Sequence, residues 1–172
     1  MTQKNIVLVT GANGHLGNNL VRLLIAKGYQ VRASVRNIKN TKPFEGLDCE
    51  VVQADITDKN SMLQALRGVD TFYAVGAVFK LWAKDPQKEI YDVNMNGCKV
   101  MIEAAVQAGV KRIVYVSSIA ALHYTKGIPI NEESGYNPDR RDMYYNSKND
   151  AEKLAFELAK KHDIELVAVL PS

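Results

Sequence analysis

The chain has 172 residues, of which 47% are hydrophobic and 24% charged, and its formal net charge is +3. This length is enough to bury one core, and the composition is typical of a single soluble globular domain rather than a disordered or fibrous chain. Lysine and arginine are scattered without a long basic run, so we expect no nucleic-acid partner.

The sequence shows no pattern typical of a targeting signal or a membrane span. Its first residues lack a charged region followed by a long apolar region, and no apolar stretch approaches the roughly 18 residues that a span requires. Cys49 and Cys98 are the only cysteines, and their spacing suits neither a disulfide framework nor a metal site. We therefore expect a cytoplasmic protein with two buried free thiols, no metal and no membrane partner.

Strand-like and helix-like segments alternate along the whole sequence. Strands are predicted at residues 5–10, 30–36, 50–54, 71–75, 112–117 and 165–170, and helices at residues 16–27, 59–67, 86–108 and 142–162. Strands that alternate with helices of this length form right-handed crossovers, so the expected fold is α/β, a doubly wound parallel sheet of the Rossmann type over residues 1–172. Residues 118–141 carry no periodicity and are expected to form a loop over the ligand crevice.

The most informative segment follows the first predicted strand and reads Thr10-Gly11-Ala12-Asn13-Gly14-His15-Leu16-Gly17. Gly11 permits a sharp turn from strand to helix, Gly14 lets a phosphate approach the backbone, and Gly17 lets the helix pack close to the strand. Such a turn brings backbone amides and a helix N-terminus to one point, which favours a dinucleotide pyrophosphate; a glycine-rich turn without a ligand is the alternative. The candidate cofactor-binding residues here are Gly11, Asn13, Gly14, His15, Leu16 and Gly17.

The spacing of these glycines, GxxGxxG, resembles the short-chain dehydrogenase/reductase superfamily, and TGxxGHLG resembles its extended branch. Within that branch, TGANGHLG, VRASVR, ADITD, VYVSS and YYNSK are similar to the group of dihydroflavonol reductases, 3β-hydroxysteroid dehydrogenases and sugar epimerases. The resemblance implies that a C-terminal substrate lobe, which would hold most of the substrate specificity, follows residue 172. The only tryptophan, Trp82, is expected to pack against the sheet edge rather than line the substrate crevice.

The residue at the end of the second predicted strand indicates which dinucleotide binds. An acidic residue there usually accepts a hydrogen bond from a free ribose 2′-OH, but this sequence has Arg36, whose guanidinium suits a 2′-phosphate. Arg32, on the same face of the strand, and His15 are expected to add positive potential. We therefore expect NADP rather than NAD; the alternative is that Arg36 is only a solvated charge.

The resemblance also assigns residues that follow the third and fourth predicted strands. Asp55 and Ile56 match the family's acidic-hydrophobic pair beside the adenine, with Asp55 accepting from the adenine amino group and Ile56 forming an apolar wall. Helix capping is an alternative for Asp55, although Asp58 already suits that position. Three small residues after the fourth strand match the segment that the cofactor ribose passes, and close packing is the alternative for them. They are Ala74, Val75 and Gly76.

Tyr144 and Lys148 form a YxxxK motif at the start of the last predicted helix. At a spacing of i and i+4 the side chains share a helix face, so the Lys148 ammonium is expected to lower the pKa of the tyrosine by roughly 1 to 3 units from its usual value near 10. With a serine at the end of the fifth predicted strand they resemble the superfamily's Ser-Tyr-Lys triad. Ser118 matches the family's serine, with Ser117 as the fallback, and would hydrogen-bond the substrate oxygen. Asn94 matches the family's helix asparagine, and helix packing is its alternative.

These residues imply an NADP-dependent oxidoreductase in which a hydride passes between nicotinamide and a ketone or secondary alcohol while Tyr144 exchanges the proton. An NAD-dependent nucleotide-sugar epimerase or dehydratase is the first alternative, and the absence of an acid at position 36 counts against it. A non-catalytic cofactor sensor is the second, and the intact Ser118, Tyr144 and Lys148 count against that. The expected partner is a small carbonyl or alcohol substrate; a homodimer is left open.

Overall fold

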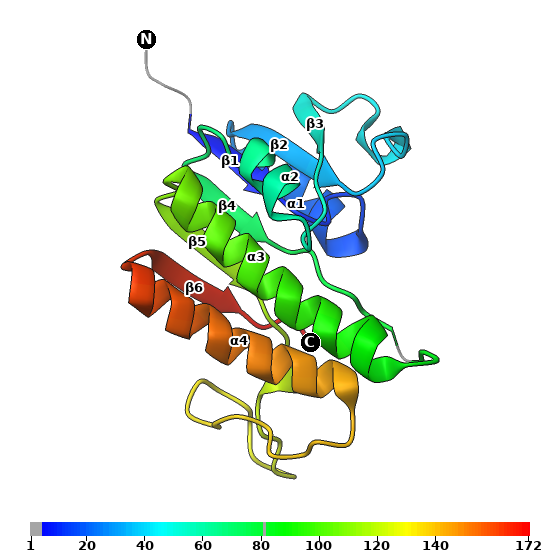
Figure 1. The fold of residues 1–172 in the computed structure, drawn as a ribbon, viewed down its shortest axis with the longest axis vertical. Helices are drawn as coiled ribbons and strands as arrows, with labels where there is room; N and C mark the ends of the chain where they lie inside the picture. The colour runs from blue at the N-terminus through cyan, green and yellow to red at the C-terminus, as the bar shows by residue number, and fades with distance from the viewer. Residues whose placement is uncertain (1–4, 81) are drawn as a thin grey trace.

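The computed structural model describes residues 5–80 and 82–172 as a parallel sheet with helices on both faces (Figure 1). The first four residues, on which the expectation about a targeting signal partly rests, lie outside this range. The strands lie in the order β3-β2-β1-β4-β5-β6, and every pairing is parallel. They are β1 (Ile6–Val9), β2 (Gln30–Val35), β3 (Cys49–Gln53), β4 (Thr71–Ala74), β5 (Arg112–Val116) and β6 (Glu165–Val169).

The doubly wound α/β fold predicted from the sequence is confirmed, and each strand begins and ends within one residue of its predicted range. The strand order reverses direction between β1 and β4, because the chain moves outward from β1 to β3 and then returns to pair β4 with β1. In open α/β sheets, ligands bind at the carboxyl ends of the strands at such a switch point. The fold therefore locates the candidate crevice before any side chain is considered.

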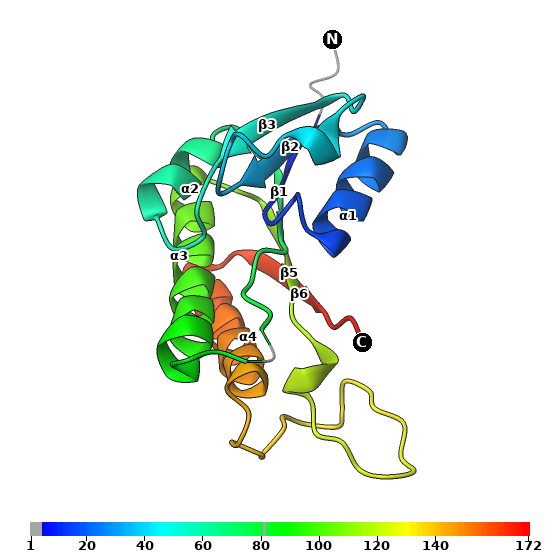
Figure 2. The same ribbon diagram turned by 90° about the vertical axis from the view of Figure 1, so that its right-hand side faces the viewer.

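The helices divide unequally between the two faces of the sheet (Figure 2). One face is covered by α1 (His15–Ala26) over β1 and β2, and the other by α2 (Lys59–Ala65), α3 (Asp92–Ala108) and α4 (Met143–His162). The predicted helix over residues 86–108 begins with a π-helical turn, η2 (Gln87–Tyr91), before it becomes regular.

The strand residues alternate between two hydrophobic cores. Leu8 packs with Phe72 and Ile113 on the face covered by α2, α3 and α4, whereas Val7 and Val9 face α1. Successive strand side chains point to opposite faces, so a strand buried on both faces needs a continuous apolar run. The sequence Ile6-Val7-Leu8-Val9 supplies that run at the centre of the sheet.

The connections contain more structure than the sequence indicates. A 3-10 turn, η1 (Lys42–Phe44), follows β2, and the expected loop at residues 118–141 begins with a second one, η3 (Ile119–Ala121). A bridge between Leu122 and Tyr136 then pairs the two ends of the remaining loop.

Two expectations about single residues are wrong in part or in full. Cys98 is fully buried as predicted, but Cys49 is only half-buried because it begins the edge strand β3. Trp82 is 75% exposed, so it does not pack against the sheet edge. Among the described helices none is long and apolar enough to cross a membrane.

Candidate functional site

The turn after β1 is fastened to the end of β4 by the hydroxyl of Thr10. This buried side chain accepts hydrogen bonds from the backbone amides of Val75 and Gly76, both at 3.0 Å. Gly11 follows with φ +61°, and a Cβ at this position would lie 3.1 Å from the Cα of Gly76. Glycine is thus required at position 11 by its dihedral angle as well as by the close approach of β4.

Gly17 has the packing role that the sequence suggests, whereas the role of Gly14 beside a phosphate stays a prediction. A Cβ at Gly17 would lie 2.8 Å from the carbonyl carbon of Gly11 and 2.9 Å from the Cα of Ala12, and closer still to the Gly11 carbonyl oxygen. These are backbone atoms that cannot move aside, so the first turn of α1 depends on a missing side chain. Gly14 is the N-cap of α1 and provides no side-chain hydrogen bond.

The N-terminus of α1 has the properties of an anion site. A helix start leaves backbone amides without intrahelical partners, and the first turn of α1 contains no acidic residue to compete for them. The candidate residues Asn13, His15 and Leu16 are exposed around this end. The turn and the helix end together fit a dinucleotide pyrophosphate.

Arg32, in β2, and Arg36, directly after it, have different surroundings. Arg36, just after the strand, is exposed, and its carbonyl accepts from the side chain of Gln53 at 3.1 Å. Arg32 forms an ion pair with Glu50 at 2.7 Å, and its guanidinium also donates to the carbonyls of Ala65 and Arg67 at the end of α2. The expectation that Arg32 adds potential to the cofactor site is therefore wrong, because three acceptors already hold it elsewhere.

Hydrogen bonds from α1 hold the segment that follows β2 against this helix. Asn18 donates to the carbonyl of Pro43 at 3.0 Å and accepts from Arg22, which also donates to that carbonyl. These contacts fix the connection that passes from Arg36 towards β3.

Asp55 and Ile56 follow β3 as expected, with contacts that the sequence does not show. One oxygen of Asp55 accepts from both the amide and the hydroxyl of Thr57, at 2.9 and 2.7 Å, so only part of the carboxylate remains for an adenine. The helix cap is Asp58, which accepts from the amide of Asn60. The Ile56 side chain lies under two glycines, since a Cβ at either would lie within 3.0 Å of it; they are Gly76 and Gly97.

At the other end of the crevice, Tyr144 and Lys148 lie on the first turns of α4. Lys148 is 3% exposed; its Nζ donates to the carbonyl of Val116 at 2.9 Å and lies 5.6 Å from the centroid of the Tyr115 ring. Burial lowers the pKa of Lys148 to about 8. An ammonium with this pKa is charged at neutral pH and loses its proton in mildly alkaline solution.

The expected fall in the pKa of Tyr144 does not occur. Partial burial raises the pKa of this phenol, with smaller effects from Ser118, which lowers it, and from Tyr145 and Asp142, which raise it. The prediction is wrong because the Lys148 ammonium faces the carbonyl at the end of β5, and because the loss of solvent around the phenol dominates. At neutral pH Tyr144 is a protonated phenol.

The structure distinguishes the two serines after β5. Ser118 caps η3, its Oγ accepts from the amide of Ala120 at 3.2 Å, and its side chain is close enough to act on the pKa of Tyr144. Ser117 is 4% exposed, and its Oγ has no hydrogen-bond partner among the described residues. The geometry therefore favours Ser118 over the fallback, and its catalytic role stays a prediction.

Asn94 links three elements around Tyr144. Its side chain exchanges two hydrogen bonds with the backbone of Val78, at 2.7 and 3.0 Å, and donates to the Oγ of Ser147 at 2.9 Å. Ser147 in turn donates to the carbonyl of Tyr144 at 2.7 Å. Asn94 thus fixes the segment after β4 against α4, and Phe79 in that segment meets the Tyr144 ring edge-on, with centroids 5.0 Å apart. Ser147 and Phe79 are residues that the sequence analysis did not single out.

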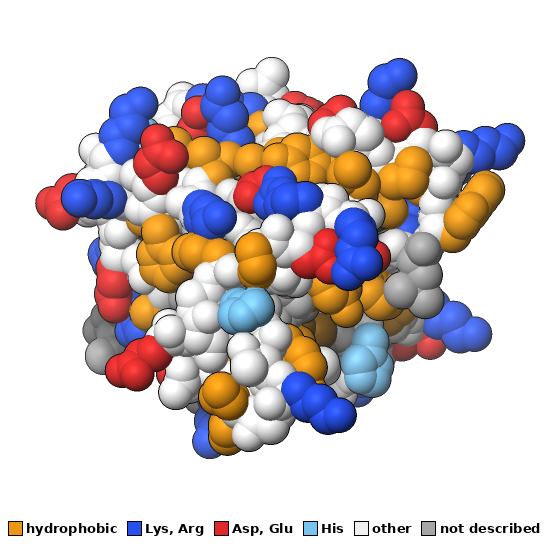
Figure 3. Space-filling view, turned by 90° about the horizontal axis from the view of Figure 1, so that it is seen from below, with side chains coloured by type: hydrophobic (Ala, Val, Ile, Leu, Met, Phe, Trp, Pro, Cys, Tyr) orange, Lys and Arg blue, Asp and Glu red, His pale blue; other side chains and the backbone are white. Residues whose placement is uncertain are grey.

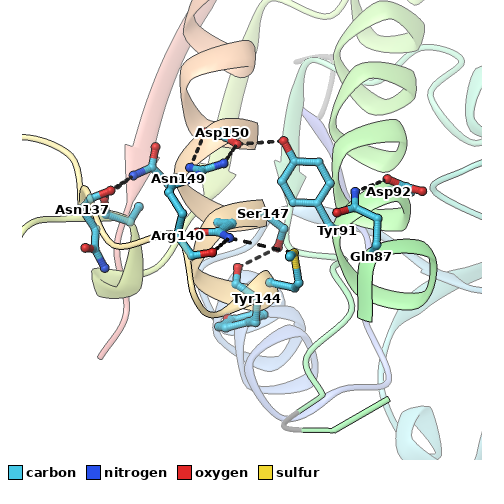
Figure 4. A network of polar contacts seen from close by, with 12 residues as sticks. Gln87, Tyr91, Asp92, Asn137, Arg140, Tyr144, Ser147, Asn149 and Asp150 are labelled. Atoms are coloured by element: carbon cyan, nitrogen blue, oxygen red, sulfur yellow. Dashed lines mark hydrogen bonds and ion pairs between the residues drawn. The ribbon is translucent and has the colours of Figure 1, made fainter. Parts of the chain in front are cut away.

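A second polar network holds the loop before α4 (Figure 4). Asp150 accepts from the hydroxyl of Tyr91 at 2.8 Å and from both terminal nitrogens of Arg140, at 3.0 and 2.5 Å. Asn146 donates to the Arg140 carbonyl at 2.7 Å, and Asn149 donates to the carbonyl of Asn137 at 2.8 Å. These contacts fix the end of the loop directly before the turn that carries Tyr144.

The segments after β4 and β5 expose several large hydrophobic side chains. In Figure 3, which views this end of the molecule from below, hydrophobic side chains lie between charged ones of both signs. The exposed fractions of four of them lie between 60 and 75%, well above the usual value for such residues. They are Phe79, Trp82, Tyr124 and Ile128.

Comparison with known proteins agrees with this geometry. Residues 8–164 match the model of the 3-beta hydroxysteroid dehydrogenase/isomerase family. The chain is 36% identical to sterol demethylase protein B of Methylococcus capsulatus over 94% of this chain and 47% of that protein. It is 34% identical to dihydroflavonol 4-reductase of Zea mays over 99% of this chain and 53% of that protein.

Solved structures show the same fold. The crystal structure of gox2253 superimposes with a TM-score of 0.87 and 31% identity, over 98% of this chain and 52% of that one. The yeast methylglyoxal/isovaleraldehyde reductase Gre2 complexed with NADPH gives a TM-score of 0.86 and 26% identity, over 96% and 57%. The chain spans about half the length of these relatives. It belongs to the 3-beta hydroxysteroid dehydrogenase/isomerase family, within the extended short-chain dehydrogenase/reductase superfamily.

Proposed function

We propose that the chain is the cofactor-binding and proton-transferring part of an NADP-dependent oxidoreductase that interconverts a ketone and a secondary alcohol. The observation that carries the proposal is the meeting of two features at one edge of the sheet. A glycine turn with an uncapped helix end follows β1, and the Ser118, Tyr144 and Lys148 side chains follow β5 and begin α4.

The residues present fit a nicotinamide dinucleotide. Backbone amides at the start of α1 would hold the pyrophosphate, and Arg36 would pair with a 2′-phosphate. The ammonium of Lys148, close to the end of β5, would donate to a ribose hydroxyl. When bound, the cofactor supplies or accepts the hydride, and the chain's own residues supply position and proton.

The protonation state of Tyr144 supports the reduction direction. A phenol whose pKa is raised holds its proton at neutral pH, so it can give that proton to the oxygen of a carbonyl as the oxygen becomes an alkoxide. Ser118, close to the same phenol, would donate a hydrogen bond to this oxygen and stabilise its developing charge. General acid catalysis of this kind contributes roughly 10² to 10⁴-fold.

Several of the relatives are reductases, among them dihydroflavonol 4-reductase of Zea mays, anthocyanidin reductase of Arabidopsis thaliana and the yeast reductase Gre2, whose structure is a complex with NADPH. A structural relative from Agrobacterium tumefaciens, 26% identical, has bound NAD instead. The choice of NADP therefore depends on this chain's own strand end, where Arg36 is exposed and no acidic side chain takes its place.

The cofactor preference can be tested with two matched variants. In a thermal or urea unfolding assay, NADPH at 100 times its dissociation constant should stabilise the parent chain by about 2.7 kcal/mol relative to the ligand-free chain. NADH at the same concentration should stabilise it less. Arg36→Asp should reverse that order, because the carboxylate repels a 2′-phosphate and accepts from a hydroxyl. Arg32→Gln is the control, since Arg32 already contacts Glu50 and the end of α2. Equal stabilisation of the parent by both nucleotides would show that Arg36 does not select the cofactor.

A further inference from the structure

Helix α4 buries two opposite charges one turn apart. Lys148 is 3% exposed and Glu152 is 5% exposed, and the spacing of i and i+4 places both side chains on one face of the helix. A charge taken out of water costs several kcal/mol unless other groups compensate it. The groups around each of the two side chains therefore decide whether each remains charged.

The immediate neighbours of Lys148 supply no negative charge at neutral pH. Its ammonium donates to the carbonyl of Val116 and faces the Tyr115 ring, and both groups are neutral. Burial raises the pKa of Tyr115 and raises that of Cys98, on the adjacent helix α3, to about 11. Tyr144 is likewise a neutral phenol.

Cys98 and Glu152 both raise the pKa of Lys148. The Cys98 thiol, with its own pKa at about 11, carries no charge at neutral pH, so Glu152 is the group that can supply a negative charge. Its Oε2 is buried and has no hydrogen-bond partner among the described residues. On its other side Glu152 lies near Tyr136: burial first, and then the nearby Glu152 carboxylate, raise the pKa of that phenol to about 12. The Nζ of Lys153 lies 4.5 Å from the centroid of the Tyr136 ring. A buried carboxylate oxygen without a donor is unusual, since buried polar groups are nearly always hydrogen-bonded.

We propose that Glu152 is a positioning residue that keeps the buried ammonium of Lys148 charged. It acts through space along one face of α4, because the described residues include no ion pair between the two side chains within 4 Å. Under the proposed function, on which the consequence for catalysis rests, a charged Lys148 can donate to a cofactor ribose, whereas a neutral one is a weaker donor. Glu152 would then set the upper pH limit of cofactor binding.

The test measures the titration of Lys148 in the chain without cofactor. Lysine labelled with ¹³C is followed by NMR from neutral to alkaline pH, and Lys148→Arg identifies the signal by its loss. Glu152→Gln should move the midpoint down by roughly one pH unit, the lower end of the effect of an opposite charge. Glu157→Gln, which removes an exposed carboxylate from the same helix, should leave it unchanged. An unchanged midpoint in Glu152→Gln would overturn the proposal.

A measurement on the parent chain covers the case in which Glu152→Gln does not fold. Glutamate labelled at the carboxyl carbon shows where Glu152 ionises. The proposal requires Glu152 to be ionised throughout the pH range in which Lys148 loses its proton. A carboxyl group still protonated at the Lys148 midpoint would overturn it.

The pH profile of NADPH binding separates this proposal from the proposed function. As the pH is raised, the affinity of Glu152→Gln for NADPH should begin to fall at a pH about one unit lower than the affinity of the parent or of Glu157→Gln. If the NMR midpoints move as expected but neither nucleotide binds the parent, then the proposed function fails and the assignment of Glu152 stands. If NADPH binds but the midpoint does not move, then only the assignment of Glu152 fails.

Discussion

The glycine turn and the Tyr144 end of the crevice are held by different kinds of interaction. At the turn, backbone packs against backbone because Gly17 leaves no room for a Cβ beside Gly11, and the Thr10 hydroxyl joins the turn to the segment after β4. At the other end, side chains contact side chains, as Asn94 donates to Ser147, and burial lowers the pKa of Lys148. Steric exclusion therefore shapes the glycine turn, whereas desolvation and hydrogen bonding shape the Tyr144 end.

This difference predicts opposite responses to substitution. A change at the turn should alter stability and binding together, because the backbone itself moves. A change at the Tyr144 end should separate chemistry from stability, because a side chain can lose its proton or its hydroxyl while the backbone stays in place.

The largest effect on the fold is expected for Gly17→Ala. The added Cβ would meet backbone atoms of Gly11 and Ala12 within 2.9 Å, so α1 must move away from β1. We expect a loss of about 3 kcal/mol in the free energy of unfolding, measured with urea, and the loss of nucleotide binding. Gly14→Ala is the matched control for the loss of stability: its Cβ would lie 3.2 Å from the Gly11 carbonyl oxygen and its φ is −80°, which alanine adopts freely. Equal losses in both variants would mean that close packing does not govern the turn.

Tyr144→Phe, unlike Gly17→Ala, should leave the free energy of unfolding and NADPH binding nearly unchanged. Removal of the phenol hydroxyl should slow ketone reduction by roughly 10²-fold or more, or about 2.7 kcal/mol in the activation barrier. Tyr145→Phe, one residue further on and 46% exposed, should have a much smaller effect. A Tyr144→Phe enzyme that retained more than about a tenth of the parent rate would exclude the phenol as the general acid.

The pKa of Lys148 predicts a specific pH dependence of stability. Between about pH 8 and the ordinary lysine value near 10.5, the unfolded chain binds a proton at this position that the folded chain does not, so Lys148 makes folding more favourable as the pH rises. Relative to Lys148→Met, the parent should gain about 2 kcal/mol in free energy of unfolding between about pH 7 and pH 9.5. Parallel pH profiles for the two proteins would show that Lys148 titrates normally.

The smallest effect is expected for Ser117→Ala. The buried Oγ has no partner among the described residues, so its removal should change the free energy of unfolding by less than about 1 kcal/mol and leave reduction intact. Ser118→Ala should instead lose the bond to the amide of Ala120 and, under the proposed mechanism, slow reduction. If Ser117→Ala were the slower enzyme, the assignment of the two serines would be reversed.

The sequence predicts the local structure around the glycine turn better because its determinants are local. The glycine spacing, the apolar run before it and the arginine after β2 are each readable over a few residues, and the strand limits agree with the structure to within one residue. Asp58 as a helix cap is equally local, and it accepts from the amide of Asn60 as expected.

Several features at the Tyr144 end depend on contacts between distant parts of the chain. The direction of the pKa shift at Tyr144 follows from how much of its ring is buried, which YxxxK does not specify. Glu152 acts on the pKa of Tyr136, which the loop after β5 brings back to α4. Nothing in the sequence around Arg32 distinguishes it from any other arginine in a strand. Its acceptors, the carbonyls of Ala65 and Arg67, lie more than 30 residues away, and only the fold brings them to it.

The uncapped start of α1 has a consequence for how the molecule responds to its ligand. Asp58 and Asp142 close the first turns of α2 and α4 with their own carboxylates, but Gly14 leaves α1 without such a bond. A bound phosphate would supply the missing acceptor, so it would serve as part of the helix as well as its ligand. Phosphate binding and the ordering of the first turn of α1 would then be thermodynamically coupled. Amide hydrogen exchange at residues 15–17 would slow when the phosphate site is occupied, and it would report cofactor binding without any turnover.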